Sequence, residues 1–188
     1  MKTSMSWQIL EETDVSPSRW FPVIKHKVQL PDGAIIDDYF VSPIGNVVMV
    51  LPLTPEGNFI LVKQYKHGLR NIFLELPGGM QQRGKSIEAS ALAELEEETG
   101  IKVTEDRLIP LGRIANNPTK TNQITYGFLV REAVINSVQK LDSTEQIELV
   151  SVHPSEAIRM IKKGTIETSD TVALLFKAYL EHPDIFLK

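Results

Sequence analysis

The chain has 188 residues and no cysteine, which excludes disulfides, thiol catalysis and zinc–thiolate sites. Its length suits one domain, or one domain with a small appendage, and 42% apolar and 23% charged residues are ordinary for a globular protein. The net charge of −4 argues against a nucleic-acid partner, and no apolar run has the length of a membrane span or of a signal core, so we expect a cytoplasmic protein without a membrane partner.

The N-terminal segment, residues 1–43, predicts an extended arm followed by a small antiparallel β hairpin. The first 17 residues are polar and give the arm. Apolar residues then alternate from Trp20 to Leu30, Pro31-Asp32-Gly33 is a strong turn signal, and Ile35 to Val41 reads as the returning strand. We therefore place the hairpin at residues 18–43 and a second domain at 44–188.

The remainder of the chain mixes strands and helices, which predicts a layered α/β domain. Runs of strand-forming residues occupy 46–53, 58–65, 71–76, 108–115, 124–130 and 147–152. Helices are expected at 87–99, with Ser86 as N-cap and Gly100 just beyond its end, at 154–163, and from Ser169 or Asp170 to Leu180.

Three carboxylates share one face of the first of these helices. Glu94, Glu97 and Glu98 stand at positions i, i+3 and i+4, so they repel one another unless a positive group compensates. Oxygen-only ligands suit Mg²⁺, Mn²⁺ or Ca²⁺. A Glu-rich helix face is most often just solvated, but the glycine turns on both sides of this helix favour a metal site.

The stretch from Gly79 to Ile101 resembles the Nudix box, the signature of the Nudix hydrolases. Its spacing is kept throughout, and the resemblance implies an α/β/α sandwich with a mixed sheet, preceded here by the N-terminal antiparallel hairpin. It also implies that Glu94, Glu97 and Glu98 bind Mg²⁺, or Mn²⁺ in its place, with Glu97 and Glu98 catalytic, and that Gly78 binds metal through its backbone oxygen. The glycines permit close backbone approach to a ligand, and Gly79 is a candidate substrate contact.

Two positions of the box depart from the family pattern. Lys85 stands where the family usually has Glu, and Ala93 stands where it usually has Arg. In the family these residues are thought to brace the loop–helix–loop. Both charges are missing together, which indicates loss of a structural brace rather than loss of the metal ligands.

A second group of residues lies in and after the strand at 58–65. Basic residues gather at Lys63, Lys66, His67 and Arg70, and such a cluster is most often solvated surface. Beside a glycine turn and a carboxylate helix it becomes a candidate pyrophosphate clamp. The string from Val62 to Gly68, with the segment 74–79 that includes Glu75, resembles the ADP-ribose and ADP-sugar pyrophosphatase branch, so we expect Lys63, Lys66, Arg70 and Glu75 to bind a nucleoside diphosphate.

The same branch suggests two further assignments. Its general base can come from an acidic loop after the box, here residues 141–148, in which Glu145 is the first choice and Glu148 the second, although a solvated turn is an equal reading. Its N-terminal strands contribute to a homodimer in which an aromatic residue stacks on adenine. Trp20 is the candidate, with hairpin packing as the more ordinary alternative.

Two functional hypotheses follow. The first is a Mg²⁺-dependent hydrolase that splits the diphosphate of ADP-ribose or an ADP-sugar into AMP and a sugar phosphate. The second is a catalytically weakened Nudix domain that binds a nucleotide as a sensor or regulatory module. Lys85 and Ala93 favour the sensor, whereas the intact carboxylate triplet favours the enzyme more strongly.

Overall fold

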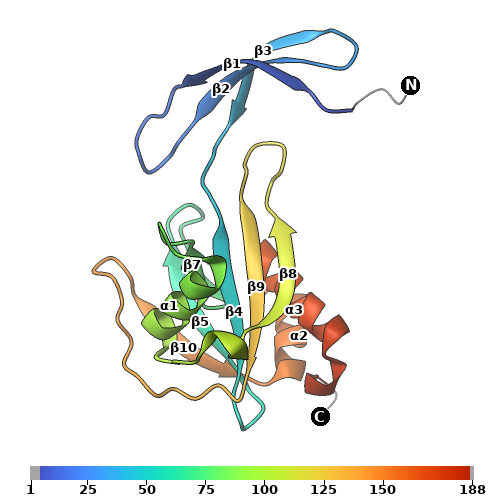
Figure 1. The fold of residues 1–188 in the computed structure, drawn as a ribbon. Helices are drawn as coiled ribbons and strands as arrows, with labels where there is room; N and C mark the ends of the chain where they lie inside the picture. The colour runs from blue at the N-terminus through green and yellow to red at the C-terminus, as the bar shows by residue number, and fades with distance from the viewer. Residues whose placement is uncertain (1–4, 187–188) are drawn as a thin grey trace. The chain divides into compact units, whose positions relative to one another are not determined.

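The computed structural model describes residues 5–186, so residues 1–4 of the predicted arm and residues 187–188 lie outside the described part. The chain forms two compact units. One comprises the residues up to Asn46 together with Ala115–Ile124, and the other comprises Val47–Ile114 and the residues from Thr125 onward. Figure 1 labels most of their strands and helices.

The N-terminal unit is a three-stranded antiparallel sheet in the order β1-β2-β3. Its strands are β1 (Gln8–Asp14), β2 (Ile24–Gln29) and β3 (Ile35–Val41). The predicted β2–β3 hairpin forms around Gly33, whose φ of 89° suits the turn, and the Ala34 N–H donates to Asp32 Oδ1 at 3.0 Å. The predicted arm is corrected in part, because residues 8–14 pair with β2 and add a third strand.

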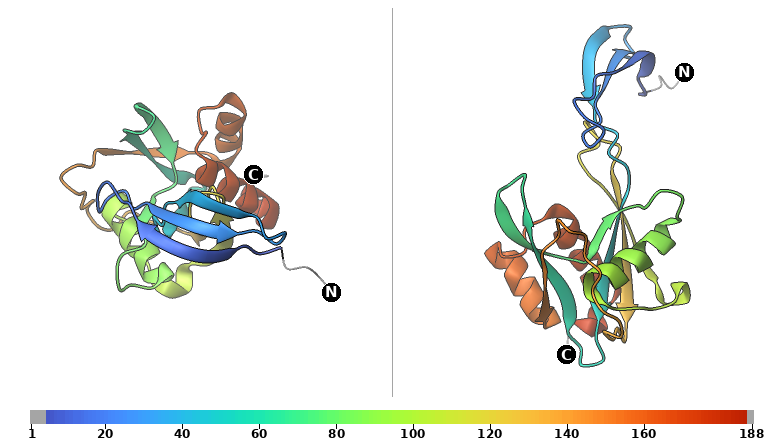
Figure 2. Two further views of the ribbon diagram at one scale, coloured as in Figure 1. Left: turned by 90° about the horizontal axis from the view of Figure 1, so that it is seen from above. Right: turned by 90° about the vertical axis from the view of Figure 1, so that its left-hand side faces the viewer.

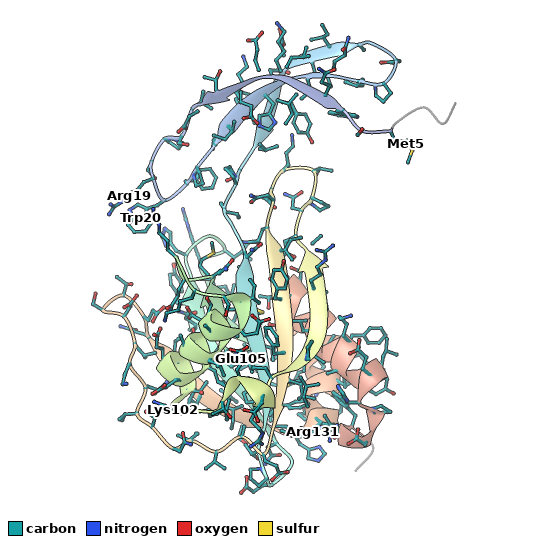
Figure 3. All side chains as sticks on the ribbon, in the orientation of Figure 1. Met5, Arg19, Trp20, Lys102, Glu105 and Arg131 are labelled. Atoms are coloured by element: carbon teal, nitrogen blue, oxygen red, sulfur yellow. The ribbon has the colours of Figure 1, made fainter. Side chains whose placement is uncertain are left out.

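The expected strand from Trp20 to Leu30 also begins later than predicted. Ser18 and Phe21 pair as an isolated bridge around a tight turn, and the Trp20 N–H donates to Ser18 Oγ. Trp20 is therefore a turn residue, with 80% of its surface exposed. The Arg19 guanidinium lies 4.5 Å from the centre of its ring (Figure 3).

The segment at residues 115–124 belongs to this same unit. Its backbone carbonyls accept hydrogen bonds from β3 and the residues after it: the Tyr39 hydroxyl donates to Thr119 O, and the Ser42 N–H donates to Lys120 O at 2.7 Å. The Gly45 N–H donates to Asn122 Oδ1 at 3.2 Å. The domain boundaries predicted from the sequence place this segment within 44–188, because its partners lie about eighty positions away in the chain and local sequence does not reveal them.

The second unit is built on a mixed sheet in the order β10-β5-β4-β9-β8, with β6 paired to β5 and β7 paired to β4. The strands β4 and β9 run parallel, whereas β4–β7, β5–β6 and β5–β10 are antiparallel. Their bounds are β4 Val47–Leu53, β5 Phe59–Lys66, β6 Asn71–Glu75, β7 Gly78–Met80, β8 Ile109–Ala115, β9 Ile124–Arg131 and β10 Ile147–Val152.

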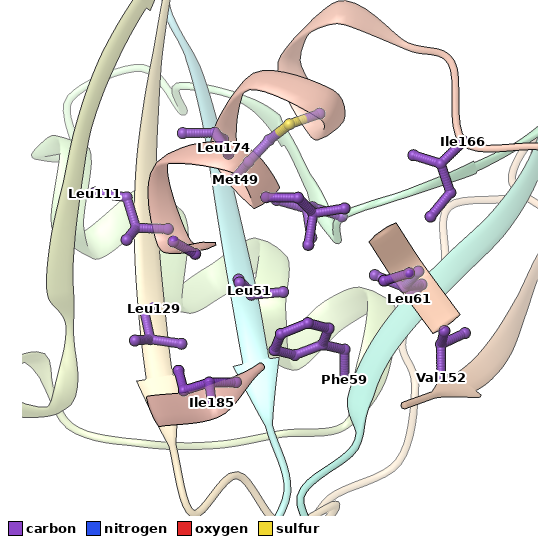
Figure 4. Packing of buried hydrophobic residues seen from close by; sticks show 14 of the residues in the cluster. Met49, Leu51, Phe59, Leu61, Leu111, Leu129, Val152, Ile166, Leu174 and Ile185 are labelled. Carbon is purple, nitrogen blue, oxygen red and sulfur yellow. The ribbon is translucent and has the colours of Figure 1, made fainter. Parts of the chain in front are cut away.

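Helices cover both faces of this sheet. Side chains alternate along each strand, so both faces carry apolar residues that pack against a helix. Leu51, Leu61 and Leu129 pack with α2 (Pro154–Lys163), α3 (Ser169–Glu181) and the short helix η2 (Pro183–Ile185) in one apolar cluster (Figure 4). Val50 and Phe128 face the opposite way and pack with α1 (Ile87–Thr99). Figure 2 shows the sheet between α1 and the C-terminal helices, which confirms the predicted α/β/α sandwich.

Helix α1 has the predicted bounds because its end signals are local. Ser86 Oγ accepts a hydrogen bond from the Ala89 N–H at 3.0 Å, and Gly100 adopts φ 72° while its N–H donates to Glu96 O. A short 3₁₀ helix, η1 (Glu105–Arg107), follows. No helix that the structure describes is both long and apolar enough to cross a membrane.

Candidate active site

The three predicted carboxylates lie in one pocket of about 500 Å³ in the second unit. Glu94, Glu97 and Glu98 of α1 line it together with Gly78 and Gly79 of β7. Within residues 5–186 no three His, Cys, Asp or Glu side chains form a ready-made metal-ligating group. The carboxylates accept hydrogen bonds from protein donors. All three line the same cavity, as their spacing along the helix predicted.

The glycine turn packs directly against the helix that carries these carboxylates. Gly78 adopts φ 156°, and its N–H donates to Glu98 Oε2 at 2.7 Å. A Cβ atom at Gly78 would lie 2.1 Å from Val48 O of the neighbouring strand, and one at Gly79 would lie 2.6 Å from Glu94 Oε2. Position 78 therefore needs glycine because backbone of β4 lies against it, whereas a side chain at position 79 would require the Glu94 carboxylate to move.

Burial and crowding raise the proton affinity of this pocket. Burial raises the pKa of Glu98 to about 8, against the opposing effect of the Gly78 N–H bond. Burial also raises the pKa of Glu94, and the nearby charges of Glu97 and Glu145 act in the same direction. The pocket is thus an oxygen-rich site in which the carboxylates crowd one another, and that donor set suits a hard divalent cation.

Lys66 is held at this pocket by two acceptors. Its ammonium group lies 3.1 Å from Glu75 Oε2 and donates to Gln64 Oε1 at 2.6 Å. The Glu75 side chain is only 9% exposed, so the pair is partly shielded from water. The predicted residues Lys66 and Glu75 therefore act together: Lys66 lines the pocket, and Glu75 fixes its direction.

The loop that follows Ile135 satisfies the free carbonyl groups at the end of α1. The Lys140 N–H donates to Glu97 O at 2.8 Å, and Gln139 Nε2 donates to Glu98 O at 2.6 Å. The Ser137 N–H donates to Gly100 O at 2.9 Å. These bonds cap the helix and hold the start of the acidic loop beside it.

The acidic loop separates the two candidate bases. Glu145 and Asp142 line the carboxylate pocket, and the Asp142 N–H donates to Glu145 Oε2 at 3.0 Å. Glu148 is paired with Lys63 at 3.0 Å, and these two line an adjacent cavity of about 540 Å³ that Glu145 also borders. The geometry thus places Glu145, rather than Glu148, beside the carboxylates.

Three other predicted residues lie elsewhere. Lys63 belongs to the adjacent cavity and Arg70 is exposed in the turn after β5, with φ 51°. Trp20 belongs to the N-terminal unit. Of the departures from the box pattern, Lys85 is exposed and Ala93 is half-buried on α1.

Six lining residues were not predicted from the sequence: Gln64, Met80, Gln81, Gln82, Lys140 and Asp142. Asp142 and Lys140 lie in or beside the acidic loop, so the loop carried a signal but its individual residues did not. Gln64 follows Lys63 on β5, and strict alternation along that strand would have placed it with Lys66. Gln82 is a neutral residue of the turn, and a neutral amide gives no sequence signal of its own.

Comparison with known proteins identifies the family of this chain. Residues 43–175 match the model of the NUDIX domain, and residues 7–42 match the nucleoside diphosphate sugar hydrolase N-terminal domain. The chain therefore belongs to the Nudix hydrolase family.

Two curated relatives each align with 77% of this chain and 77% of their own length. The ADP-ribose pyrophosphatase of Bacillus subtilis (strain 168) is 32% identical over 145 residues, and the methanol dehydrogenase activator of Bacillus methanolicus is 30% identical over 146 residues. A crystal structure of an ADP compounds hydrolase shares the fold, with a TM-score of 0.85 over 98% of both chains at 20% identity.

Proposed function

We propose that this protein hydrolyses the diphosphate bond of a nucleoside diphosphate derivative, ADP-ribose or an ADP-sugar, and releases AMP and a sugar phosphate. The observation that carries the proposal is the pocket in which Glu94, Glu97 and Glu98 face a glycine turn with Lys66 beside them. The relationship to an ADP-ribose pyrophosphatase over most of the chain supports the choice of substrate.

The metal-binding residues in this proposal are Glu94, Glu97 and Glu98, with the backbone oxygen of Gly78. Their oxygen donors and the raised pKa values of Glu94 and Glu98 support a divalent cation, for which Mg²⁺ is the first choice and Mn²⁺ the second. When bound, such an ion neutralises the diphosphate and lowers the pKa of the attacking water.

The protein's own groups then position the reaction. Glu145 accepts a proton from the water that attacks phosphorus, and the P–O bond to the departing phosphate ester breaks. Lys66, directed by Glu75, contacts a non-bridging phosphate oxygen, and the open backbone at Gly79 lets the diphosphate approach. In this proposal Lys63 and Arg70 bind more distant parts of the substrate.

The adenosine part is assigned to the N-terminal sheet of a homodimer. Several large apolar side chains of the N-terminal unit are exposed, including Trp20 at 80% and Phe21 at 58%. A second copy of this chain would cover them, and Trp20 would stack on adenine.

The alternative, a nucleotide sensor of the same family, rests on Lys85 and Ala93, which lack the charges of the usual brace. One assay separates the two. The protein is incubated with a panel of nucleoside diphosphate derivatives and Mg²⁺ or Mn²⁺, and the released AMP and phosphate esters are measured. Metal-dependent turnover of an ADP compound supports the enzyme, whereas tight binding of the same compounds without products supports the sensor.

A further inference from the structure

The turn between β7 and α1 places a neutral amide between two of the three carboxylates. Gln82 Nε2 lies 3.3 Å from Glu94 Oε1 and 3.5 Å from Glu97 Oε2. A primary amide carries two N–H donors, so one side chain can serve both acceptors at once. Both bonds are long, which suits a group that orients the carboxylates more than it neutralises them.

The backbone of this glutamine is anchored to the helix. The Gln82 N–H donates to Ser90 Oγ at 3.1 Å, and Ser90 is fully buried. Ser90 Oγ in turn donates to Ser86 O at 2.8 Å, and the Lys85 N–H closes the turn on Gln82 O at 3.1 Å. The side-chain amide therefore extends from a fixed point rather than from a free surface loop.

The charges of the surrounding residues explain why a neutral donor matters here. Ala93 has no charge and Lys85 is exposed in the turn, so these two positions cannot form an ion pair with each other. An amide can set the direction of two carboxylates while leaving their charge available to a cation. A lysine or arginine in the same place would compete with that cation.

We propose that Gln82 is a positioning residue that holds Glu94 and Glu97 in the orientation that binds a divalent cation. This inference rests on the metal binding assigned under the proposed function. It adds a residue that the charge pattern of the box does not contain.

The test is a titration of the purified full chain with Mn²⁺, in which the electron paramagnetic resonance signal of the free ion measures how much Mn²⁺ remains unbound. Gln82→Met keeps the length of the side chain and removes both donors. We expect its Mn²⁺ dissociation constant to rise about ten-fold, the scale for losing a group that orients a metal ligand. Gln82→Asn keeps the donors but withdraws them by one methylene, so its loss should be smaller. Gln123→Met, the same change in the N-terminal unit, should leave Mn²⁺ binding unchanged.

Hydrolysis measured on the same proteins gives a second readout. Gln82→Met should lose turnover at low Mn²⁺ and recover most of it at saturating Mn²⁺, because the ligands themselves remain. If Gln82→Met binds Mn²⁺ with wild-type affinity, the proposal is overturned, whether or not any substrate is hydrolysed. If Gln82→Met does not fold, wild-type Mn²⁺ affinity in Gln82→Asn overturns it instead. A wild-type protein that binds no Mn²⁺ overturns it too. A protein that binds Mn²⁺ with the expected order of affinities but hydrolyses no ADP compound contradicts the proposed function alone.

Discussion

The backbone N–H of Gly78 donates a 2.7 Å hydrogen bond to Glu98 Oε2, which joins the glycine turn to the helix twenty residues later. This bond gives a buried carboxylate a specific partner and sets its position in the pocket. Because Glu98 is only 5% exposed, its charge has little access to water. Its chemistry therefore depends on what the pocket contains, and the first two predictions concern it.

Loss of either carboxylate that we propose as catalytic should abolish most of the activity. We expect Glu97→Gln and Glu98→Gln each to lower turnover at least about 100-fold, the scale for removing a key electrostatic group, while the fold is kept. Glu88→Gln, in the first turn of the same helix, is the matched control and should stay near wild type. Near-normal metal-dependent turnover in both variants, measured by AMP release, would falsify the site.

The raised pKa of Glu98 predicts how the stability of the metal-free protein depends on pH. The folded protein holds this proton up to about pH 8, whereas the unfolded chain releases it near 4.5, so the folded state binds more protons between these values. Stability should therefore fall as pH rises from about 4.5 through about 8. Glu98→Gln cannot ionise, so at pH 8 it should melt at least about 3 °C above wild type in EDTA.

Two controls accompany this measurement. At pH 4.5 the melting temperatures of Glu98→Gln and wild type should converge, because the wild-type carboxyl is then protonated. Glu88→Gln should follow wild type at every pH. Parallel melting curves for wild type and Glu98→Gln across this range would show that Glu98 titrates normally.

The close approach of Gly79 to Glu94 gives a second test of the pocket. A Cβ at residue 79 would lie 2.6 Å from Glu94 Oε2, so Gly79→Ala must displace that carboxylate. We expect kcat/KM to fall on the order of 10–100-fold, because small displacements of catalytic groups are costly. Gly68→Ala is the control, since a Cβ there meets nothing within 4 Å. Equal kcat/KM values for Gly79→Ala and Gly68→Ala would mean that the position of the Glu94 carboxylate does not contribute to catalysis.

The unusual pair in the box is tested by a double-mutant cycle. If Lys85 and Ala93 reflect a lost ion pair, the double variant Lys85→Glu with Ala93→Arg should keep or raise activity, and each single change should be worse. Residues in one charge network couple by at least about 0.5 kcal/mol. Purely additive effects on kcat/KM would show that the two positions act independently.

The N-terminal sheet is tested through assembly and substrate affinity. Trp20→Ala should raise KM for ADP-ribose about five-fold and change kcat little, because stacking on a remote base stabilises ground and transition states alike. Deletion of residues 1–43 should weaken both dimerisation and ADP-ribose binding. Phe176→Ala, another exposed aromatic residue, should leave KM unchanged. A monomer at micromolar concentration in sedimentation, with unchanged KM in Trp20→Ala, contradicts this assignment.

Tertiary contacts determined several features that local sequence does not encode. Strand β1 has every residue exposed and its two apolar residues, Ile9 and Leu10, are adjacent rather than alternating, so it forms through pairing with the edge of β2. Strand β7 spans only Gly78–Met80 and exists through its pairing with β4. The choice between Glu145 and Glu148 likewise depends on β10, whose register against β5 places Glu148 opposite Lys63.

Local sequence signals define the box helix and the placement of its carboxylates. Ser86 and Gly100 fix the ends of α1, and the 3.6-residue repeat places Glu94, Glu97 and Glu98 on one face. Contacts between elements select the residues that complete the pocket. Lys63 and Lys66 are equivalent as basic residues in the sequence, but a separation of three positions along β5 places them on opposite faces of the strand. The position of Gln82 depends on the hydrogen bond that its N–H donates to Ser90 Oγ. Spacing within one helix is set by its own hydrogen bonds, whereas contacts between elements depend on how the whole sheet is paired.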